Sequence, residues 1–538
     1  MLPRIYSGAR RAGIRRLLLN GVAQTGVAFL VAWSVRTSIG RTAAGENLGL
    51  PIAALIGGGV AMFALRVLQR TEAERIGQDY VMRVRMRLFD RISALPPHAE
   101  RNERYGLTLT RMVTDLNSLR AWASQGFAQV LVASVAIPGT LAAIAWVHPS
   151  AGIAACALVL LCLGVGVLTA TRLRDQVREL RRRRGRMAAN LGEKVAAYLS
   201  VRHFGRTVPE LRRVRSHSQR MRDAAVRRAR TMEMVRAAPD AALPVATAIL
   251  LLGSQGSGVL LGRAELVTAV VLLGLLSRSV RDVARGWSQR LNYEEGYRRI
   301  SQVLESERIR EPGAPSELPP AEATPLIVDD VGLEGVFAGA YLYAPPGSQI
   351  AVTGPSGAGK SALLGLIARL ADPSQGELSL GDVALPSLSS EDRHSAIQLV
   401  SPSLPLIRGT VAQNVEYAAA VQPDAAVVAA RICRLHEPSC GLPDGLETHV
   451  EEQGRNLANG VRARVALARA LATQPRVLLI DDLVFSADDE ARSALLAAIE
   501  HFDFTLVWTV RRDEDLVAFD QIWQVAAGKV VAKNLEPR

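Results

Sequence analysis

The chain has 538 residues and a formal net charge of +13. That length predicts more than one domain. A basic surplus can indicate a nucleic-acid-binding protein, but here the arginines gather beside long apolar runs, at residues 10–16, 172–186 and 278–290. This is the positive-inside distribution of an integral membrane protein. The four-arginine run at 181–184 also lacks the interleaved aromatic residues that a base-stacking surface uses. We therefore expect no nucleic-acid partner.

Six apolar runs, each near the roughly 20 residues that cross a bilayer, predict six membrane-spanning helices. The runs are 17–38, 48–68, 125–147, 151–171, 238–261 and 264–286. Charged blocks with helical spacing separate them at 70–120 and 172–236, and their arginines place these blocks on the cytoplasmic side. The first run is interpreted as an uncleaved span, because further spans follow it. We expect a multi-pass membrane domain over residues 1–306, with a cytoplasmic N-terminus and the lipid bilayer as its surroundings.

The sixth run carries charged residues in its second half, namely Arg278, Arg281 and Asp282. Such charges either extend to the inner membrane interface or line a polar cavity. The first explanation is favoured. The alternative is that Arg278 faces a cavity for an acidic or amphipathic substrate.

After the spans, residues 307–323 are rich in Pro, Gly and acidic residues and predict a linker. From residue 324 to 538, apolar runs at 349–353, 397–401, 477–481 and 504–509 predict strands. Helical patterns lie between and after them, at 360–370, 424–435, 459–473 and 488–501. This alternation predicts an α/β domain of the P-loop type with a mainly parallel sheet.

One motif in this domain is complete: it has the spacing G-x-x-x-x-G-K-[ST] and lies between a predicted strand and a predicted helix. Its glycines let backbone N–H groups surround phosphate oxygens, and the following helix N-terminus favours negative charge. Lys360 supplies a positive charge and the Ser361 hydroxyl can bind Mg²⁺. The predicted ATP-binding residues are Gly354, Pro355, Ser356, Gly357, Ala358, Gly359, Lys360, Ser361 and Ala362.

Six spans, two long cytoplasmic blocks, a linker and a P-loop domain resemble an ATP-binding-cassette (ABC) half-transporter of the exporter type. Further motifs follow in the family's order. Residues 477–481 are an apolar strand ending in Asp481, which resembles the Walker B strand whose carboxylate holds Mg²⁺. Residues 464–471 resemble the helix after the family signature, 485–488 the D-loop, and 528–530 the closing hairpin. The resemblance implies a dimer in which each ATP lies between the phosphate loop of one cassette and the signature of the other.

Four catalytic elements depart from the family pattern. The signature, Leu-Ser-Gly-Gly-Gln in the family, reads Leu457, Ala458, Asn459, Gly460 and Val461 here. The carboxylate after Walker B is the shorter Asp482 instead of Glu. Pro402 stands at the place of a Mg²⁺-sensing Gln, and Arg511 at that of the switch His; an arginine cannot accept a proton. The adenine-stacking residue is not evident, with Gly335 near its place and Phe337 as a possible substitute.

The sequence therefore predicts a plasma-membrane ABC exporter subunit that binds Mg·ATP, with degenerate catalytic residues Asp482 and Arg511. A heterodimer with a second half-transporter is favoured over a homodimer, because a partner would supply an intact signature. Two alternatives stay open: a non-hydrolytic, ATP-gated regulatory membrane subunit, and a self-sufficient homodimeric exporter. The substrate is open as well, among small molecules, lipids and peptides.

Overall fold

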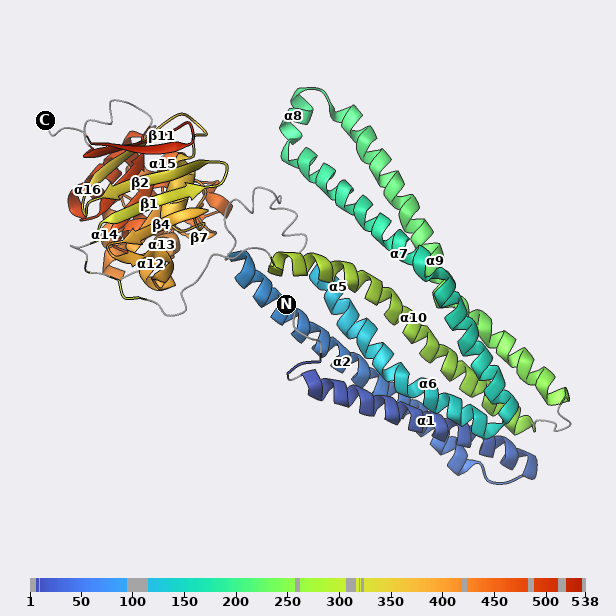
Figure 1. Ribbon diagram of the computed structural model, residues 1–538. Coiled ribbons are helices and arrows are strands. Elements are labelled where there is room, and N and C mark those ends of the chain that lie inside the picture. The colour runs from blue at the N-terminus through green and yellow to red at the C-terminus, as the bar shows by residue number, and fades with distance from the viewer. Residues whose placement is uncertain are drawn as a thin grey trace. The chain divides into compact units, whose positions relative to one another are not determined.

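The computed structural model describes residues 6–8, 10–93, 115–256, 262–305, 316–318, 320, 324–418, 423–481, 488–510 and 519–534. The chain divides into two compact units (Figure 1). One contains the helices as far as Glu305, and the other contains the sheets and shorter helices that follow. The predicted limits 1–306, 307–323 and 324–538 stay predictions.

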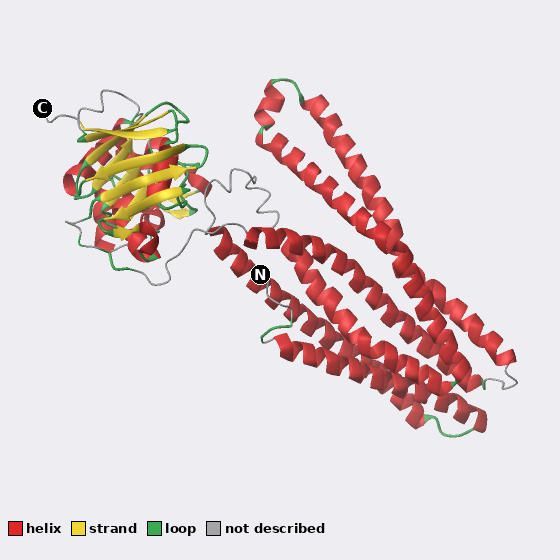
Figure 2. Ribbon diagram, in the orientation of Figure 1, coloured by secondary structure: helices red, strands yellow, loops and turns green. Residues whose placement is uncertain are grey.

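The first unit consists of long helices (Figure 2). A short π-helix, η2, joins α5 to α6 without a break, so these three elements form one rod. The elements are α1 (Arg10–Ala44), α2 (Gly49–Ser93), α5 (Leu116–Ala121), η2 (Trp122–Phe127), α6 (Ala128–Val147), α7 (Pro149–Ala196), α8 (Tyr198–His203), α9 (Thr207–Gly256) and α10 (Arg263–Glu305).

Five of the described helices are long and apolar enough to cross a membrane. They are α1, α2, the α5–η2–α6 rod, α7 and the part of α9 as far as Leu252. The sixth predicted range, 264–286, is helical throughout as part of α10. It lies outside the set that length and composition identify because it carries too many charged residues, namely Glu265, Arg278, Arg281 and Asp282.

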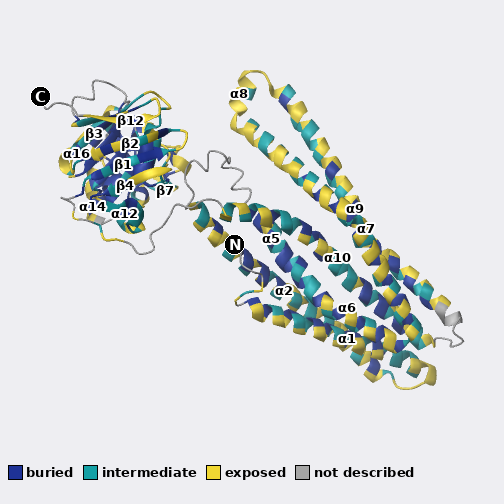
Figure 3. Ribbon diagram, in the orientation of Figure 1, coloured by how far each residue is buried: buried dark blue, intermediate teal, exposed yellow. Residues whose placement is uncertain are grey.

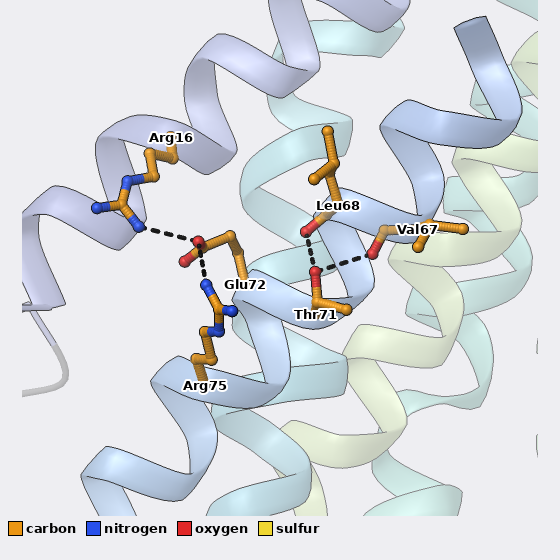
Figure 4. A network of polar contacts seen from close by, with 6 residues as sticks. All are labelled: Arg16, Val67, Leu68, Thr71, Glu72 and Arg75. Carbon is orange, nitrogen blue, oxygen red and sulfur yellow. Dashed lines mark hydrogen bonds and ion pairs between the residues drawn. The ribbon is translucent and has the colours of Figure 1, made fainter.

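Small residues bring the membrane helices close together. Gly13 of α1 lies against Ile76 of α2, and Gly58 of α2 lies against Val31 of α1, each at a distance that leaves little room for a Cβ atom. Small side chains allow this approach between apolar helices, where water provides no driving force. Figure 4 shows the charged end of the same contact, where Glu72 accepts hydrogen bonds from Arg16 at 2.9 Å and from Arg75 at 3.1 Å.

The helices α7 and α9 run side by side over their whole length, and α8 lies at the tip that joins them (Figure 1). Exposed residues dominate α8 and the neighbouring ends of α7 and α9 (Figure 3). By contrast, the other ends of these two helices contribute Ala154, Leu158, Ala242 and Leu250 to a buried core with α10. The pair therefore changes from an apolar segment with one buried face to a charged, exposed arm.

The second unit is built on two sheets with helices packed against them (Figure 2). The six-stranded sheet has the order β12-β11-β3-β10-β9-β6 and is parallel except for the β11–β12 hairpin. Its strands are β3 (Gln349–Thr353), β6 (Ile397–Val400), β9 (Val477–Ile480), β10 (Thr505–Thr509), β11 (Gln521–Ala526) and β12 (Lys529–Asn534). The parallel sheet that the sequence predicts is therefore present.

The four-stranded sheet is antiparallel, with the order β2-β1-β4-β5, and was not predicted. Its strands are β1 (Leu326–Leu333), β2 (Phe337–Ala344), β4 (Gln375–Leu380) and β5 (Val383–Ala384). A two-stranded sheet pairs β7 (Gly409–Thr410) with β8 (His449–Val450). The helices of four or more residues are α11 (Lys360–Ile367), α12 (Ser390–Ala396), α13 (Val411–Val415), α14 (Pro423–Ile432), α15 (Asn459–Leu471) and α16 (Asp489–His501).

Candidate nucleotide-binding site of the cassette

The phosphate loop lies where the sequence places it, between the end of β3 and the start of α11. Gly354, Gly357 and Gly359 have φ angles of 141°, 81° and 107°, which L side chains rarely adopt. A Cβ atom on Gly354 would lie 2.0 Å from the Val525 carbonyl oxygen of β11, and one on Gly359 would lie 2.5 Å from the Val336 side chain. Both the conformation and the packing therefore require glycine at these two positions.

Lys360 folds back over the loop, and its Nζ donates to the carbonyl oxygens of Gly354 at 2.7 Å and Pro355 at 2.9 Å. The ammonium group is thus held beside the loop rather than extended into solvent. Lys360 and Ser361 also begin α11, and backbone N–H groups of a first helical turn have no acceptor within the helix. A positive side chain and a helix N-terminus therefore converge at one point, which is the arrangement that binds phosphate.

Asp481 connects this loop to the ends of two parallel strands. Its Oδ1 accepts a hydrogen bond from the Ser361 hydroxyl at 2.9 Å, and its Oδ2 accepts one from the Ser401 hydroxyl at 3.1 Å. Parallel pairing of Val400 with Ile480 explains why the next residues, Ser401 and Asp481, meet at the same sheet edge. The two residues predicted to bind Mg²⁺, Ser361 and Asp481, are therefore in direct contact. Hydroxyl and carboxylate oxygens are the ligands that Mg²⁺ prefers, so these residues fit a Mg·ATP site.

Ser401 is a residue that the sequence analysis missed, and it precedes Pro402, which stands at the place of the family's Gln. The hydroxyl of Ser401 also contacts that of Ser403 at 2.9 Å and accepts from its backbone N–H at 3.2 Å. Pro402 offers no side-chain hydrogen bond. The polar contact to Asp481 on this strand is therefore made by Ser401.

A cavity of about 160 Å³ lies beside Asp481, between the loop after β6 and the first turns of α15. Ser401, Pro402, Asn459 and Arg462 contribute to its wall together with Asp481. Within one chain, the structure thus brings an edge of the phosphate site and the first residue of the signature helix to the same cavity.

The signature residues lie at the N-terminus of α15. Ala458 is the N-cap and makes no side-chain hydrogen bond, as expected for a residue without a hydroxyl. Asn459 instead accepts a hydrogen bond from Arg462. Gly460 contacts Asp488, the N-cap of α16, so closely that a Cβ atom would lie 1.9 Å from its Oδ2. Leu457 and Val461 are buried in the core of this part of the cassette.

Arg469 fixes the far end of the same helix to the loop after Ser401. Its guanidinium donates to the carbonyl oxygens of Leu404 at 2.8 Å and Pro405 at 3.2 Å. Burial lowers the pKa of Arg469, and the neighbouring Tyr417 opposes this effect. Because the unperturbed pKa is far above neutral, the side chain stays charged, and the two carbonyl oxygens satisfy it. These two hydrogen bonds attach the loop to the signature helix.

Several predicted residues lie outside the described part of the chain. These are Asp482, Arg511 and the D-loop residues 485–487. Phe337, the possible adenine-stacking residue, is buried in the core under the antiparallel sheet, so it does not present its ring to a ligand. Gly335 lies in the exposed turn between β1 and β2.

In the membrane unit, the charges of α10 are paired in part. Arg281 binds Asp240 of α9, and Asp282 lies 3.8 Å from Arg66 of α2 and 3.5 Å from Arg285. Arg278 is exposed on α10. The spacing 278, 281, 282, 285 places all four charges on one face of the helix, which favours a polar surrounding over lipid for that face.

Comparisons with known proteins agree with this architecture. Residues 12–280 match the ABC transporter transmembrane region and residues 338–484 match the ABC transporter family. An ATP-dependent lipid A-core flippase of Burkholderia pseudomallei is 35% identical over 188 residues, which cover 35% of this chain and 32% of that protein. The matched part is thus about a third of the relative's length.

A second such flippase, from Thiobacillus denitrificans, is 26% identical over 446 residues, which cover 79% of this chain and 75% of the relative. The solved structure of a bacterial Atm1-family ABC exporter with ATP bound has the same fold, with a TM-score of 0.84 at 19% identity over 97% of this chain and 94% of that one. The transmembrane match alone spans half of the chain. With its helical membrane region and its α/β nucleotide-binding cassette, the chain belongs to the ABC transporter family, as a half-transporter of the exporter type.

Proposed function

We propose that this chain binds Mg·ATP at residues 354–361 and Asp481, and that it couples closure of a cassette dimer to export of a substrate across the plasma membrane. The cassette then lies on the cytoplasmic side of the membrane. When bound, Mg·ATP supplies the phosphoanhydride whose binding and cleavage drive closure and reopening. The observation that carries this proposal is the direct contact of Ser361 with Asp481. Beside it, hydrogen bonds to the phosphate loop hold the Lys360 ammonium group where it can bind phosphate.

The roles of the protein groups follow from their positions. With ATP bound, Lys360 would exchange its two carbonyl partners for phosphate oxygens, which are stronger acceptors because they are charged. Ser401 orients the Asp481 carboxylate from the side opposite Ser361. Hydrolysis needs a further base, and the shorter Asp482 and the Arg511 substitution argue for slow turnover by this chain alone.

A heterodimer best explains how the chain could work with an altered signature at residues 457–461. Ala458 lacks the hydroxyl that the resemblance assigns to phosphate binding, and Asn459 points its amide oxygen to Arg462 instead. A partner half-transporter with an intact signature would complete the site on residues 354–361. The second candidate is a regulatory subunit that binds ATP without hydrolysing it; the four altered catalytic elements favour it. The relatives named as lipid A-core flippases favour a lipid among the candidate substrates.

Binding of a fluorescent ATP analogue to the full chain in nanodiscs tests the nucleotide site. Lys360→Ala removes charge-assisted hydrogen bonds worth about 1.5–3 kcal/mol, so we expect affinity to fall about tenfold or more. Asp481→Asn should weaken the dependence of binding on Mg²⁺. Lys529→Ala, at an exposed turn of the β11–β12 hairpin, is the matched control and should bind as the wild type does. Equal affinity of the Lys360 and Lys529 variants would contradict the assignment.

Crosslinking tests the dimer. In the proposed arrangement, a cysteine at Ser356 of one subunit lies near a cysteine at Asn459 of the other when Mg·ATP is bound. If the purified chain carrying both substitutions forms an ATP-dependent dimer crosslink, it is a homodimer. If it crosslinks only after addition of a second half-transporter with matching cysteines, the heterodimer is supported.

A further inference from the structure

The arm formed by residues 172–196 of α7 and 207–236 of α9 contains a cavity with an unusual lining. The cavity has a volume of about 310 Å³ and is lined by Arg183 and Arg186 of α7 and by His217 and Arg220 of α9. A second cavity of about 290 Å³ adjoins it and shares Arg183 and Arg186; the rest of its lining is Arg178, Arg182, Asp175 and Glu179. Basic side chains from two helices thus converge on one hollow.

Acidic residues neutralise only part of this cluster. Glu179 already accepts from Arg183 at 2.5 Å and from Arg227 at 3.3 Å, and Glu295 of α10 binds Arg178 at 3.3 Å. In the part of the chain that the structure describes, no carboxylate lies within ion-pair distance of Arg186 or Arg220. Like charges that are held together without a counter-charge repel one another, so an anion in the cavity would relieve this repulsion.

The same imbalance continues along the arm. Arg228 of α9 is partly buried, its Nε is fully buried without a hydrogen-bond partner, and its charged neighbours are Arg184 and Arg236. An unpaired buried donor is costly. Within the described residues, Arg186, Arg220 and Arg228 therefore have no carboxylate in ion-pair distance, and guanidinium binds phosphate oxygens through two parallel hydrogen bonds.

The distance of the cavity from the membrane indicates whether its ligand is a soluble anion or a lipid head group. The apolar run of α7 ends at residue 171, so Arg183 and Arg186 lie about 20 Å farther along the helix. The head-group layer extends only about 5–7 Å beyond the hydrocarbon core on each side. The cavity is therefore beyond reach of lipid phosphates if the helix is not strongly inclined to the membrane.

The two helices are antiparallel at the cavity, as Ser218 of α9 contacts Met187 of α7 and Arg227 of α9 contacts Glu179 of α7. A ligand that binds Arg186 and Arg220 together would tie the helices to each other about three to four turns from the ends of α7 and α9 that flank α8. We propose that this cavity binds a soluble, multiply charged phosphate anion and that the bound anion stiffens the arm. This goes beyond the ATP site of the proposed function and does not depend on it.

Isothermal titration calorimetry with inorganic pyrophosphate tests the proposal on the full chain in phosphatidylcholine nanodiscs. The Lys360→Ala background weakens phosphate binding by the cassette, so failure here and failure of the ATP site are distinguishable. We expect one pyrophosphate per chain, with affinity about tenfold lower in Arg186→Gln and in Arg220→Gln. Arg212→Gln, which removes an exposed arginine of α9 outside the cavity, should leave affinity unchanged.

Three outcomes would overturn the proposal. An Arg212→Gln loss equal to that of Arg186→Gln would mean that pyrophosphate responds to surface charge in general. Loss of binding in nanodiscs rich in phosphatidylglycerol would mean that lipid head groups occupy the cavity. Affinity for inorganic phosphate equal to that for pyrophosphate would mean a site for any anion. Retained pyrophosphate affinity in both lipid compositions, with weaker phosphate binding, is the result that the proposal predicts.

Discussion

Gly354 offers the sharpest test of how the phosphate loop is held. In Gly354→Ala, the new Cβ would lie 2.0 Å from the Val525 carbonyl oxygen, so β3 and β11 must separate. Overpacking costs about 1–3 kcal/mol, and the φ angle of 141° adds about 1–3 kcal/mol of backbone strain. We therefore expect the cassette to lose about 4 kcal/mol of unfolding free energy.

Two further glycines provide matched controls. Gly357 has a φ angle of 81° but open space around a Cβ, so Gly357→Ala should cost only the strain of about 1–2 kcal/mol. Gly365 lies within α11 with open space around it, and Gly365→Ala should stabilise by about 0.5–1 kcal/mol. Pulse proteolysis of the full chain in denaturant, followed by detection of the C-terminal cassette, measures all three. Equal losses for Gly354→Ala and Gly357→Ala would refute the assigned contact with β11.

Three other substitutions test separate contacts. Ser401→Ala removes a hydrogen bond to Asp481, so the Mg²⁺ concentration needed for half-maximal ATP binding should rise several-fold. An unchanged Mg²⁺ concentration would show that Ser401 does not orient the carboxylate. Gly460→Ala should displace the N-cap Asp488 and lower the unfolding free energy of the cassette, measured in denaturant, by about 1 kcal/mol or more. A variant as stable as the wild type would contradict this close contact between α15 and α16. Burial raises the pKa of the Cys433 thiol, so above the ordinary thiol pKa of about 8.5 only the unfolded chain ionises. The unfolding free energy of the wild-type cassette should therefore fall between about pH 8.5 and 10. An equal fall in Cys433→Ala would exclude this thiol as the cause.

The parallel sheet and the phosphate loop could be predicted because their signals are local. The strand before Gly354, the glycine spacing and the strand ending at Asp481 are each visible within a few residues. The predicted helix at 360–370 ends at Ile367 in the structure, where Arg369 takes a positive φ of 49°. The antiparallel sheet was missed because its strands carry tyrosines such as Tyr341 and Tyr343 on an exposed face, and its pairing depends on contacts far apart in sequence.

The features of the site that could not be predicted depend on contacts between segments that are far apart in the sequence. Ser401 looks like an ordinary strand end until β6 is known to pair with β9, which brings it to Asp481. The closure of β11 over Gly354 likewise depends on a strand that is remote in the sequence. Neither contact can be predicted from hydrophobic periodicity or motif spacing. Knowledge of the strand order would have found both.

The measurement that tests the central claim most directly is the steady-state ATPase rate of the purified chain in nanodiscs beside Lys360→Ala, with Mg·ATP binding measured on the same samples. We expect that the wild type binds Mg·ATP, that Lys360→Ala binds it about tenfold or more weakly, and that both hydrolyse it at the same background rate until a partner half-transporter is added. Fast turnover by the chain alone, abolished in Lys360→Ala, would contradict the need for a partner.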